Sequence, residues 1–170
     1  NHALPATGQT LSWDPDGLNN MVLTSGSSGT PKAVVHRLAN HLASARGSAS
    51  LIPLDADCGW LLSLPLFHVG GYAILFRVFL AGASLVLDDR SQPLKERLER
   101  LPITHLSLVP TQLWRILDHP DLDRYDTSSV RNVGGGSAVW PPELLRTLAE
   151  RIPTAKAGTA LGYGSTETTD

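Results

Sequence analysis

The chain lacks the features that would direct it to a membrane, an oxidising compartment or a polyanion. It has a single cysteine, Cys58, so it cannot form an internal disulfide framework, and it suits a reducing compartment. No apolar run approaches the length of about 18 residues that a membrane-spanning helix needs. The formal net charge of −2 gives no reason to expect binding to nucleic acid or to a membrane surface. We therefore expect a cytoplasmic globular protein.

What the chain does contain fits one domain with a sizeable core. It has 170 residues, of which 42% are hydrophobic and 18% are charged. Residues 1–20 carry proline and glycine without sustained periodicity, which predicts a lead-in loop or linker with a short strand near residues 10–13. The first residue is not methionine and the last lies directly after a motif. We therefore expect an excised piece of a larger protein, with residues 21–170 as an incomplete core subdomain.

Strand-like and helix-like segments alternate along the core. Strands are predicted over residues 21–23, 33–35, 60–64, 84–87, 104–109, 130–133 and 159–163, and helices over residues 40–50, 70–80, 94–101, 110–119 and 141–152. Residues 121–129 are predicted to be loop. This alternation indicates an α/β fold with a mostly parallel sheet covered by helices. Such sheets bind ligands beyond the carboxyl ends of their strands, so we expect the polar loops 24–32, 65–71, 134–137 and 162–167 to line one crevice.

The most distinctive of these loops combines glycines, hydroxyls and a lysine between two apolar runs. It consists of Thr24, Ser25, Gly26, Ser27, Ser28, Gly29, Thr30, Pro31 and Lys32. Backbone amides, hydroxyls and a cation are the groups that surround a polyphosphate. A flexible linker or an ordinary hairpin turn has a similar composition, so the residues alone leave both interpretations open. The spacing is not that of a Walker A loop, which disfavours the usual P-loop NTPase.

Two other loops offer groups for a nucleotide. Glu167 could bind a hard cation such as Mg²⁺ beside phosphates, or it could be a solvated surface residue. Residues 134–136 are three glycines, which could let a flat nucleobase lie against the backbone or could form a plain tight turn.

A histidine and an arginine are candidates for binding a second substrate. His68 lies just beyond a predicted strand, where it could line an acyl pocket or form a local structural hydrogen bond. Arg77 falls in an apolar helix, where a charge is costly unless it reaches solvent or binds an anion. The other histidines have no metal-ligand spacing, and the residues support no Ser/His/Asp triad.

Three of these motifs, in this order, resemble the adenylate-forming superfamily, which includes acyl-CoA ligases, firefly luciferase and peptide-synthetase adenylation domains. Residues 24–32 are similar to its signature phosphate loop. Residues 163–167 match its Y-G-x-T-E motif, and residues 64–68 resemble its segment before the acyl pocket. The resemblance spans residues 20–170, and it departs from the pattern at Ala33, where glycine is common.

The resemblance implies a two-step reaction that consumes ATP, with Mg²⁺ as metal and coenzyme A as co-substrate. A carboxylate would first become an acyl-adenylate, and the thiol of coenzyme A would then displace AMP. The catalytic residues would be Lys32, Thr166 and Glu167, with Glu167 on the metal. His68 and Gly70 would line the acyl site. The implied ATP-binding residues are Thr24, Ser25, Gly26, Ser27, Ser28, Gly29, Thr30, Lys32, Gly134, Gly135, Gly136, Ser137, Gly162, Tyr163, Gly164, Ser165 and Thr166.

Residues 41–45, 62–69 and 107–115 further resemble coenzyme A ligases that act on an aromatic dicarboxylate. We expect Arg77 to bind the carboxylate that does not react. Another acyl- or aryl-CoA ligase, an adenylation domain and a non-catalytic nucleotide-binding module are the alternatives, and homodimer formation is left open. The family's ribose-binding aspartate, hinge and catalytic lysine would lie beyond Asp170, so we expect no ligase turnover from this piece alone.

Overall fold

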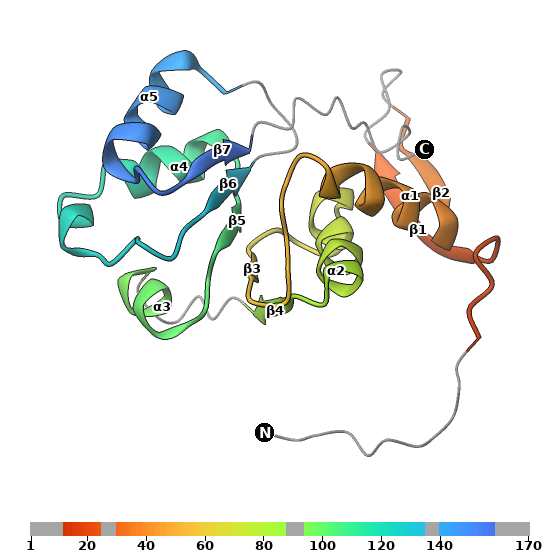
Figure 1. The fold of residues 1–170 in the computed structure, drawn as a ribbon. Helices are drawn as coiled ribbons and strands as arrows, with labels where there is room; N and C mark the ends of the chain where they lie inside the picture. The colour runs from red at the N-terminus through yellow and green to blue at the C-terminus, as the bar shows by residue number, and fades with distance from the viewer. Residues whose placement is uncertain (1–11, 25–29, 88–93, 135–139, 159–170) are drawn as a thin grey trace.

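Two sheets organise the described part of the chain (Figure 1). The structure is a computed structural model that describes residues 12–24, 30–87, 94–134 and 140–158. Its elements are, in order, β1 (Leu18–Thr24), β2 (Lys32–Arg37), α1 (Leu38–Ala49), β3 (Gly59–Leu62), α2 (Val69–Ala81), β4 (Ser84–Leu87), α3 (Leu94–Arg100), β5 (His105–Ser107), α4 (Pro110–Leu117), the 3-10 helix η1 (Leu122–Arg124), β6 (Asn132–Gly134), α5 (Pro142–Arg151) and β7 (Lys156–Gly158).

Five of the described strands form a parallel sheet in the order β4-β3-β5-β6-β7. The chain runs outward from β3 in one direction to β4 and then in the other direction through β5, β6 and β7. The strand order therefore reverses between β3 and β5, and this is the point where doubly wound sheets open a ligand crevice beyond their carboxyl ends.

The two faces of the parallel sheet are covered by different helices. Leu61, Leu106 and Val133 are neighbours in register, and they pack with apolar residues of α3, α4 and α5. The adjacent residue Trp60 faces the other way and packs with Ile74 of α2. Because side chains alternate along a strand, the apolar residues of β3 pack into the hydrophobic clusters on both faces of the sheet. Figure 1 shows α1 lying beside α2, on the side away from α4 and α5.

Glycine and proline set the ends of several helices, as the sequence predicts. Gly82 ends α2 in the left-handed conformation with φ of 66°, and its N–H donates to the carbonyl of Phe79 at 3.3 Å. Pro110 occupies the first turn of α4, where its missing N–H costs nothing. At Gly71 an added Cβ would lie 2.7 Å from the carbonyl oxygen of Leu64, so only glycine lets α2 begin this close to the preceding loop.

The predicted α/β class with a mostly parallel sheet is confirmed, but the phosphate-loop segment is not part of that sheet. β1 and β2 form a separate antiparallel hairpin. A short connection can only join antiparallel strands, because a parallel return needs a long crossover. Of the four loops expected to follow equivalent strands, 65–71 and 134–137 begin at the carboxyl edge of the parallel sheet. The loop 24–32 begins in the hairpin instead, and residues 162–167 lie outside the described residues.

Three boundaries also differ from the prediction. Ser12 and Trp13, the described part of the strand expected over residues 10–13, belong to no helix or strand; a turn follows them, in which Gly17 N–H donates to the carbonyl of Asp14 at 3.1 Å. The loop expected over residues 121–129 contains η1. The structure also forms a strand that the sequence did not predict, β7, just before residues 159–163; the strand expected over 159–163 lies outside the described residues and stays a prediction.

Candidate active site

The hairpin β1–β2 presents the two ends of the candidate phosphate loop next to each other. Thr24 and Lys32 are paired in register at the end of the hairpin where the connecting loop begins and ends. Thr30 and Lys32 are exposed, whereas the hydroxyl oxygen of Thr24 is buried and has no hydrogen-bond partner among the described residues. A buried hydroxyl without a partner is costly, so Thr24 offers a ligand an unused donor beside a lysine cation.

The carboxyl edge of the parallel sheet is tied together where the strand order reverses. The Ser63 hydroxyl donates to the carbonyl of Ser107, and the Trp60 indole N–H donates to the Ser107 hydroxyl at 3.0 Å. On the other side of β5, the N–H of Leu108 donates to the carbonyl of Gly134 at 2.8 Å. These bonds fix the ends of β3, β5 and β6 against one another, and they place Gly134 at the edge from which the loops 65–71 and 134–137 depart.

His68 caps the start of α2 at this same edge. Its Nδ1 accepts the N–H of Gly70 at 3.1 Å, which satisfies one of the free amides of the first helical turn. In the neutral ring that bond assigns the proton to Nε2. His68 and the preceding Phe67 are exposed, with 82% of Phe67 accessible to solvent. The histidine is therefore both a structural cap and a donor available to a ligand.

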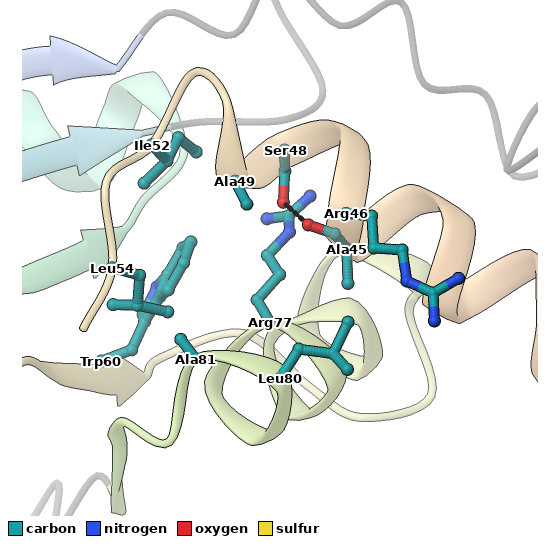
Figure 2. A pocket seen from close by; sticks show the side chains of 10 residues that line it. All are labelled: Ala45, Arg46, Ser48, Ala49, Ile52, Leu54, Trp60, Arg77, Leu80 and Ala81. Carbon is teal, nitrogen blue, oxygen red and sulfur yellow. Dashed lines mark hydrogen bonds between the residues drawn. The ribbon is translucent and has the colours of Figure 1, made fainter. Parts of the chain in front are cut away.

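Arg77 lies in a pocket between α1 and α2 (Figure 2). The pocket has a volume of about 350 Å³. The guanidinium carbon of Arg77 lies 5.5 Å from the centre of the Trp60 ring, and its Nε is buried without a hydrogen-bond partner among the described residues. Burial lowers the pKa of Arg77 from its usual value. The pocket is lined by Ala45, Arg46, Ser48, Ala49, Ile52, Leu54, Trp60, Arg77, Leu80 and Ala81.

The chemistry of this pocket suits an anion with an apolar body. Ile52, Leu54 and Trp60 form apolar walls, and the guanidinium of Arg77 points between α1 and the Trp60 ring (Figure 2). Arg46 lies at the exposed rim and adds a second positive charge. An arginine that is largely buried and incompletely hydrogen-bonded can gain most from a planar carboxylate, which matches its fork of donors.

The described residues bring some of the predicted site residues together and separate others. Gly134 and His68 lie at the carboxyl edge of the parallel sheet, and Thr24 and Lys32 lie together on the hairpin. Arg77 follows His68 on α2 by roughly 13 Å, at 1.5 Å per residue, so the two do not meet in one small cluster. The remaining predicted residues lie outside the described residues, and their roles stay predictions: Ser25, Gly26, Ser27, Ser28, Gly29, Gly135, Gly136, Ser137, Gly162, Tyr163, Gly164, Ser165, Thr166 and Glu167.

Sequence reasoning did not find the partners of these groups. Trp60 and Ser107 were predicted only as residues of two strands, yet their hydrogen bond connects the Arg77 pocket to the carboxyl edge. A serine at the end of an apolar strand was the available signal. Within the described ranges, no group of three or more His, Cys, Asp or Glu side chains could hold a metal ion. The predicted metal ligand Glu167 lies outside these ranges.

The fold and motifs have clear counterparts among known proteins. The model of the family described as AMP-binding enzyme matches residues 3–169, nearly the whole chain. The chain belongs to the AMP-binding enzyme family. Among relatives of this AMP-binding chain, 2-succinylbenzoate–CoA ligase of Escherichia coli (strain K12) is 46% identical over 155 residues, covering 91% of this chain and 32% of the relative. The enzyme of that name from Haemophilus influenzae is 42% identical, covering 86% of this chain and 31% of the relative.

Solved structures show the same relationship. Wild-type E. coli MenE with a bound m-phenylether-linked analogue of OSB-AMS is 45% identical with a TM-score of 0.70, covering 84% of this chain and 30% of that chain. MenE from Bacillus subtilis in complex with ATP and magnesium ion is 30% identical with a TM-score of 0.68, covering 81% of this chain and 29% of that one. The AMP-binding chain thus spans about a third of the length of the curated relatives it matches.

None of the helices in the described ranges combines the length and apolar character that a bilayer crossing requires.

Proposed function

We propose that this chain is the nucleotide-binding core of an o-succinylbenzoate–CoA ligase that acts in menaquinone biosynthesis. The observation that carries the proposal is the 46% identity to E. coli 2-succinylbenzoate–CoA ligase across 91% of the chain. The Thr24 hydroxyl and the Nε of Arg77, which have no hydrogen-bond partner among the described residues, support it, because the reaction needs a site for a triphosphate and a site for a dicarboxylate.

In the first step a carboxylate oxygen of the acid forms a bond to the α-phosphorus of ATP, and the bond from that phosphorus to the β-phosphate bridge breaks. In the second step the sulfur of coenzyme A bonds to the acyl carbon, AMP leaves with the bridging oxygen, and the thiol proton is lost to solvent or to a base. Both reactants of the first step are anions, so positioning and charge neutralisation dominate its barrier.

The hairpin supplies the groups for the triphosphate. Lys32 is exposed at its end, so its ammonium is free to contact the β- and γ-phosphates, and the Thr24 hydroxyl can donate to a phosphate oxygen. Bound Mg²⁺ would neutralise phosphate charge, with the carboxylate of Glu167 as its protein ligand. Thr166 would lie near the α-phosphate, while the glycine segment that starts at Gly134 would lie against the adenine.

Helix α2 supplies the groups for the acid. His68 at its start would contact the reacting end, because Nδ1 accepts the N–H of Gly70 and leaves Nε2–H of this exposed residue as a donor. Arg77 would bind the carboxylate that does not react. The apolar walls of the pocket would hold the aromatic ring beside Arg77.

The proposal is tested on the full-length protein by measuring pyrophosphate release with a panel of acids and by detecting the coenzyme A thioester. We expect substantial release with o-succinylbenzoate and little with benzoate or with an aryl monoacid that lacks the ring carboxylate. Lys32→Ala should abolish most of the release. Preference for another acid would instead identify a different acyl- or aryl-CoA ligase, and ATP binding without release for any acid would indicate a non-catalytic module. The proposal places the enzyme in the cytoplasm, consistent with its single cysteine.

A further inference from the structure

Two consecutive asparagines at the start of β1 hold the hairpin to two different helices. The side-chain oxygen of Asn19 accepts the hydroxyl of Tyr72 on α2 at 3.0 Å. The side-chain oxygen of Asn20 lies 2.8 Å from Nε2 of His41 on α1. Both bonds are partly buried, and both join residues far apart in the sequence. The hairpin is thus connected to α1 and to α2 by adjacent residues of one strand.

A β-bulge makes this double connection possible. Leu18 pairs with Arg37 and Asn20 pairs with His36, so the single residue Asn19 is inserted opposite one step of β2. In a regular strand, neighbouring side chains point to opposite faces and only one asparagine could reach the helices. The extra residue re-aims the side chain, which is a common role of bulges near functional sites. Asn19 and Asn20 can therefore both contact the helix pair.

The partners of the asparagines are themselves fixed by an aromatic cluster. The His41 ring stacks on Phe76 with 4.7 Å between ring centres and an interplanar angle of 6°, and Tyr72 meets it edge-on at 5.1 Å. Burial, and secondarily the nearby His36, lower the pKa of His41 to about 4, so the ring is neutral near pH 7. Its Nδ1 is buried without a partner among the described residues, which assigns the single proton to Nε2, the donor to Asn20.

The opposite face of the hairpin has no such contacts within the described residues. Met21 and Leu23 are 67% and 75% exposed, whereas Val22 between them is 3% exposed. The inner face, with the two asparagine bonds and the buried His36 opposite them, therefore determines how the described hairpin lies on the helices.

We propose that Asn19 and Asn20 are positioning residues that set the phosphate-loop hairpin at a fixed place relative to the acid-binding helix α2. The proposal rests on the function proposed above, in which Thr24 and Lys32 hold the triphosphate while α2 holds the acid. The attacking carboxylate and the α-phosphate must be in line at close range, so a shift of the hairpin by about 1 Å would slow the first step. Neither asparagine touches a substrate in this arrangement.

The test uses the full-length protein and separates the two half-reactions. Tyr72→Phe removes only the hydroxyl that Asn19 accepts and keeps the ring that packs on His41. Tyr125→Phe is the matched control, because Tyr125 also bonds a histidine, His119, but at an exposed place on the far side of the parallel sheet. We expect Tyr72→Phe to lower kcat/KM for ATP in adenylation about fivefold, which is the effect expected from the loss of one hydrogen bond. Tyr125→Phe should leave kcat/KM unchanged.

The rate of thioester formation from preformed acyl-adenylate distinguishes a positioning role from a merely structural one. A merely structural defect would slow both half-reactions, whereas a displaced hairpin should slow only adenylation. Thioester formation needs no β- or γ-phosphate contact, so Tyr72→Phe should leave its rate unchanged. Asn19→Ala should lower kcat/KM for ATP in adenylation as much as Tyr72→Phe does. The double variant Asn19→Ala with Tyr72→Phe should lower it no further than either single variant. Asn19→Asp should retain activity because it keeps the acceptor oxygen. Equal loss in both half-reactions, or unchanged adenylation in Tyr72→Phe, would overturn the proposal.

If wild-type protein adenylates no acid, the proposed function fails but the positioning claim is still tested by calorimetry with Mg·ATP. The dissociation constant should then rise about fivefold in Tyr72→Phe and in Asn19→Ala, and stay at the wild-type value in Tyr125→Phe. Identical dissociation constants in all four proteins would overturn the positioning claim alone.

Discussion

Arg77 provides the sharpest separation between stability and function in this chain. Replacing it with methionine keeps most of the side-chain length and removes the charge. In the free protein the Nε of Arg77 is buried without a partner among the described residues, and a group in that state costs about 1–3 kcal/mol. The substitution also removes the contact with Trp60, which contributes about 0.5–2 kcal/mol. These terms oppose each other, so we expect the free energy of unfolding to lie between about 1 kcal/mol below and about 2.5 kcal/mol above that of the wild type.

The effect on substrate binding should be much larger. Hydrogen bonds between a guanidinium and a carboxylate are worth about 1.5–3 kcal/mol, and tenfold in affinity corresponds to about 1.4 kcal/mol. Arg77→Met should therefore raise the KM for o-succinylbenzoate by about 10- to 150-fold. The KM for ATP should stay within about twofold, because the phosphate-binding hairpin contributes no residue to the lining of this pocket.

The assay is pyrophosphate release by the full-length enzyme, with thermal unfolding measured on the same samples. Arg46→Met is the matched control, because Arg46 lines the same pocket but is exposed, and a rim charge should change the KM only slightly. A monoacid analogue without the ring carboxylate should bind wild type and Arg77→Met equally well. An unchanged KM for the diacid, or the same loss for the diacid and the monoacid, would refute the assignment of Arg77.

Three further outcomes follow from the hairpin, the aromatic cluster and the start of α2. Lys32→Ala should weaken Mg·ATP binding at least tenfold by calorimetry while leaving the melting temperature unchanged, because the lysine is exposed; equal affinities would contradict its role. As pH falls from 6.5 to about 4, the unfolded chain protonates His41 but the folded protein does not, so the free energy of unfolding should fall by about 3 kcal/mol over that window. Urea titrations at several pH values should show that the free energy of unfolding depends less steeply on pH in His41→Gln than in wild type. An unchanged dependence on pH would argue against protonation of His41 as the cause. Gly71→Ala should destabilise the protein by more than about 2 kcal/mol because its Cβ would overlap the carbonyl of Pro65. Gly47→Ala, where an added Cβ meets nothing, should be neutral or stabilise by up to about 1 kcal/mol, and equal melting temperatures for the two variants would contradict the packing at Gly71.

Local signals in the sequence were sufficient for most helices and strands. Gly82 and Pro110 mark helix boundaries through backbone geometry that depends only on the residue itself, and the apolar run around Leu61 indicates a buried strand in any arrangement. The order of the strands depends instead on which apolar faces pack together over long distances. The separation of the phosphate-loop hairpin from the parallel sheet therefore became visible only in three dimensions.

The candidate site shows the same division. The composition of residues 24–32 and the charge of Arg77 within an apolar helix were both visible in the sequence as anomalies that a ligand could explain. The sequence could not show that Trp60 lies against Arg77, because the two come from different elements. Asn19 and Asn20 fell within residues read as a linker, since a β-bulge is defined only by its partner strand.

The most direct measurement of the central claim is a crystal structure of the full-length protein with Mg·ATP and a non-reacting analogue of the acid. The account predicts that the ammonium of Lys32 lies within hydrogen-bond distance of the β- or γ-phosphate and that the carboxylate of Glu167 binds Mg²⁺ on the other side of the same triphosphate. A complex with Lys32 and Glu167 at opposite ends of the molecule, or with ATP bound away from the hairpin, would contradict it.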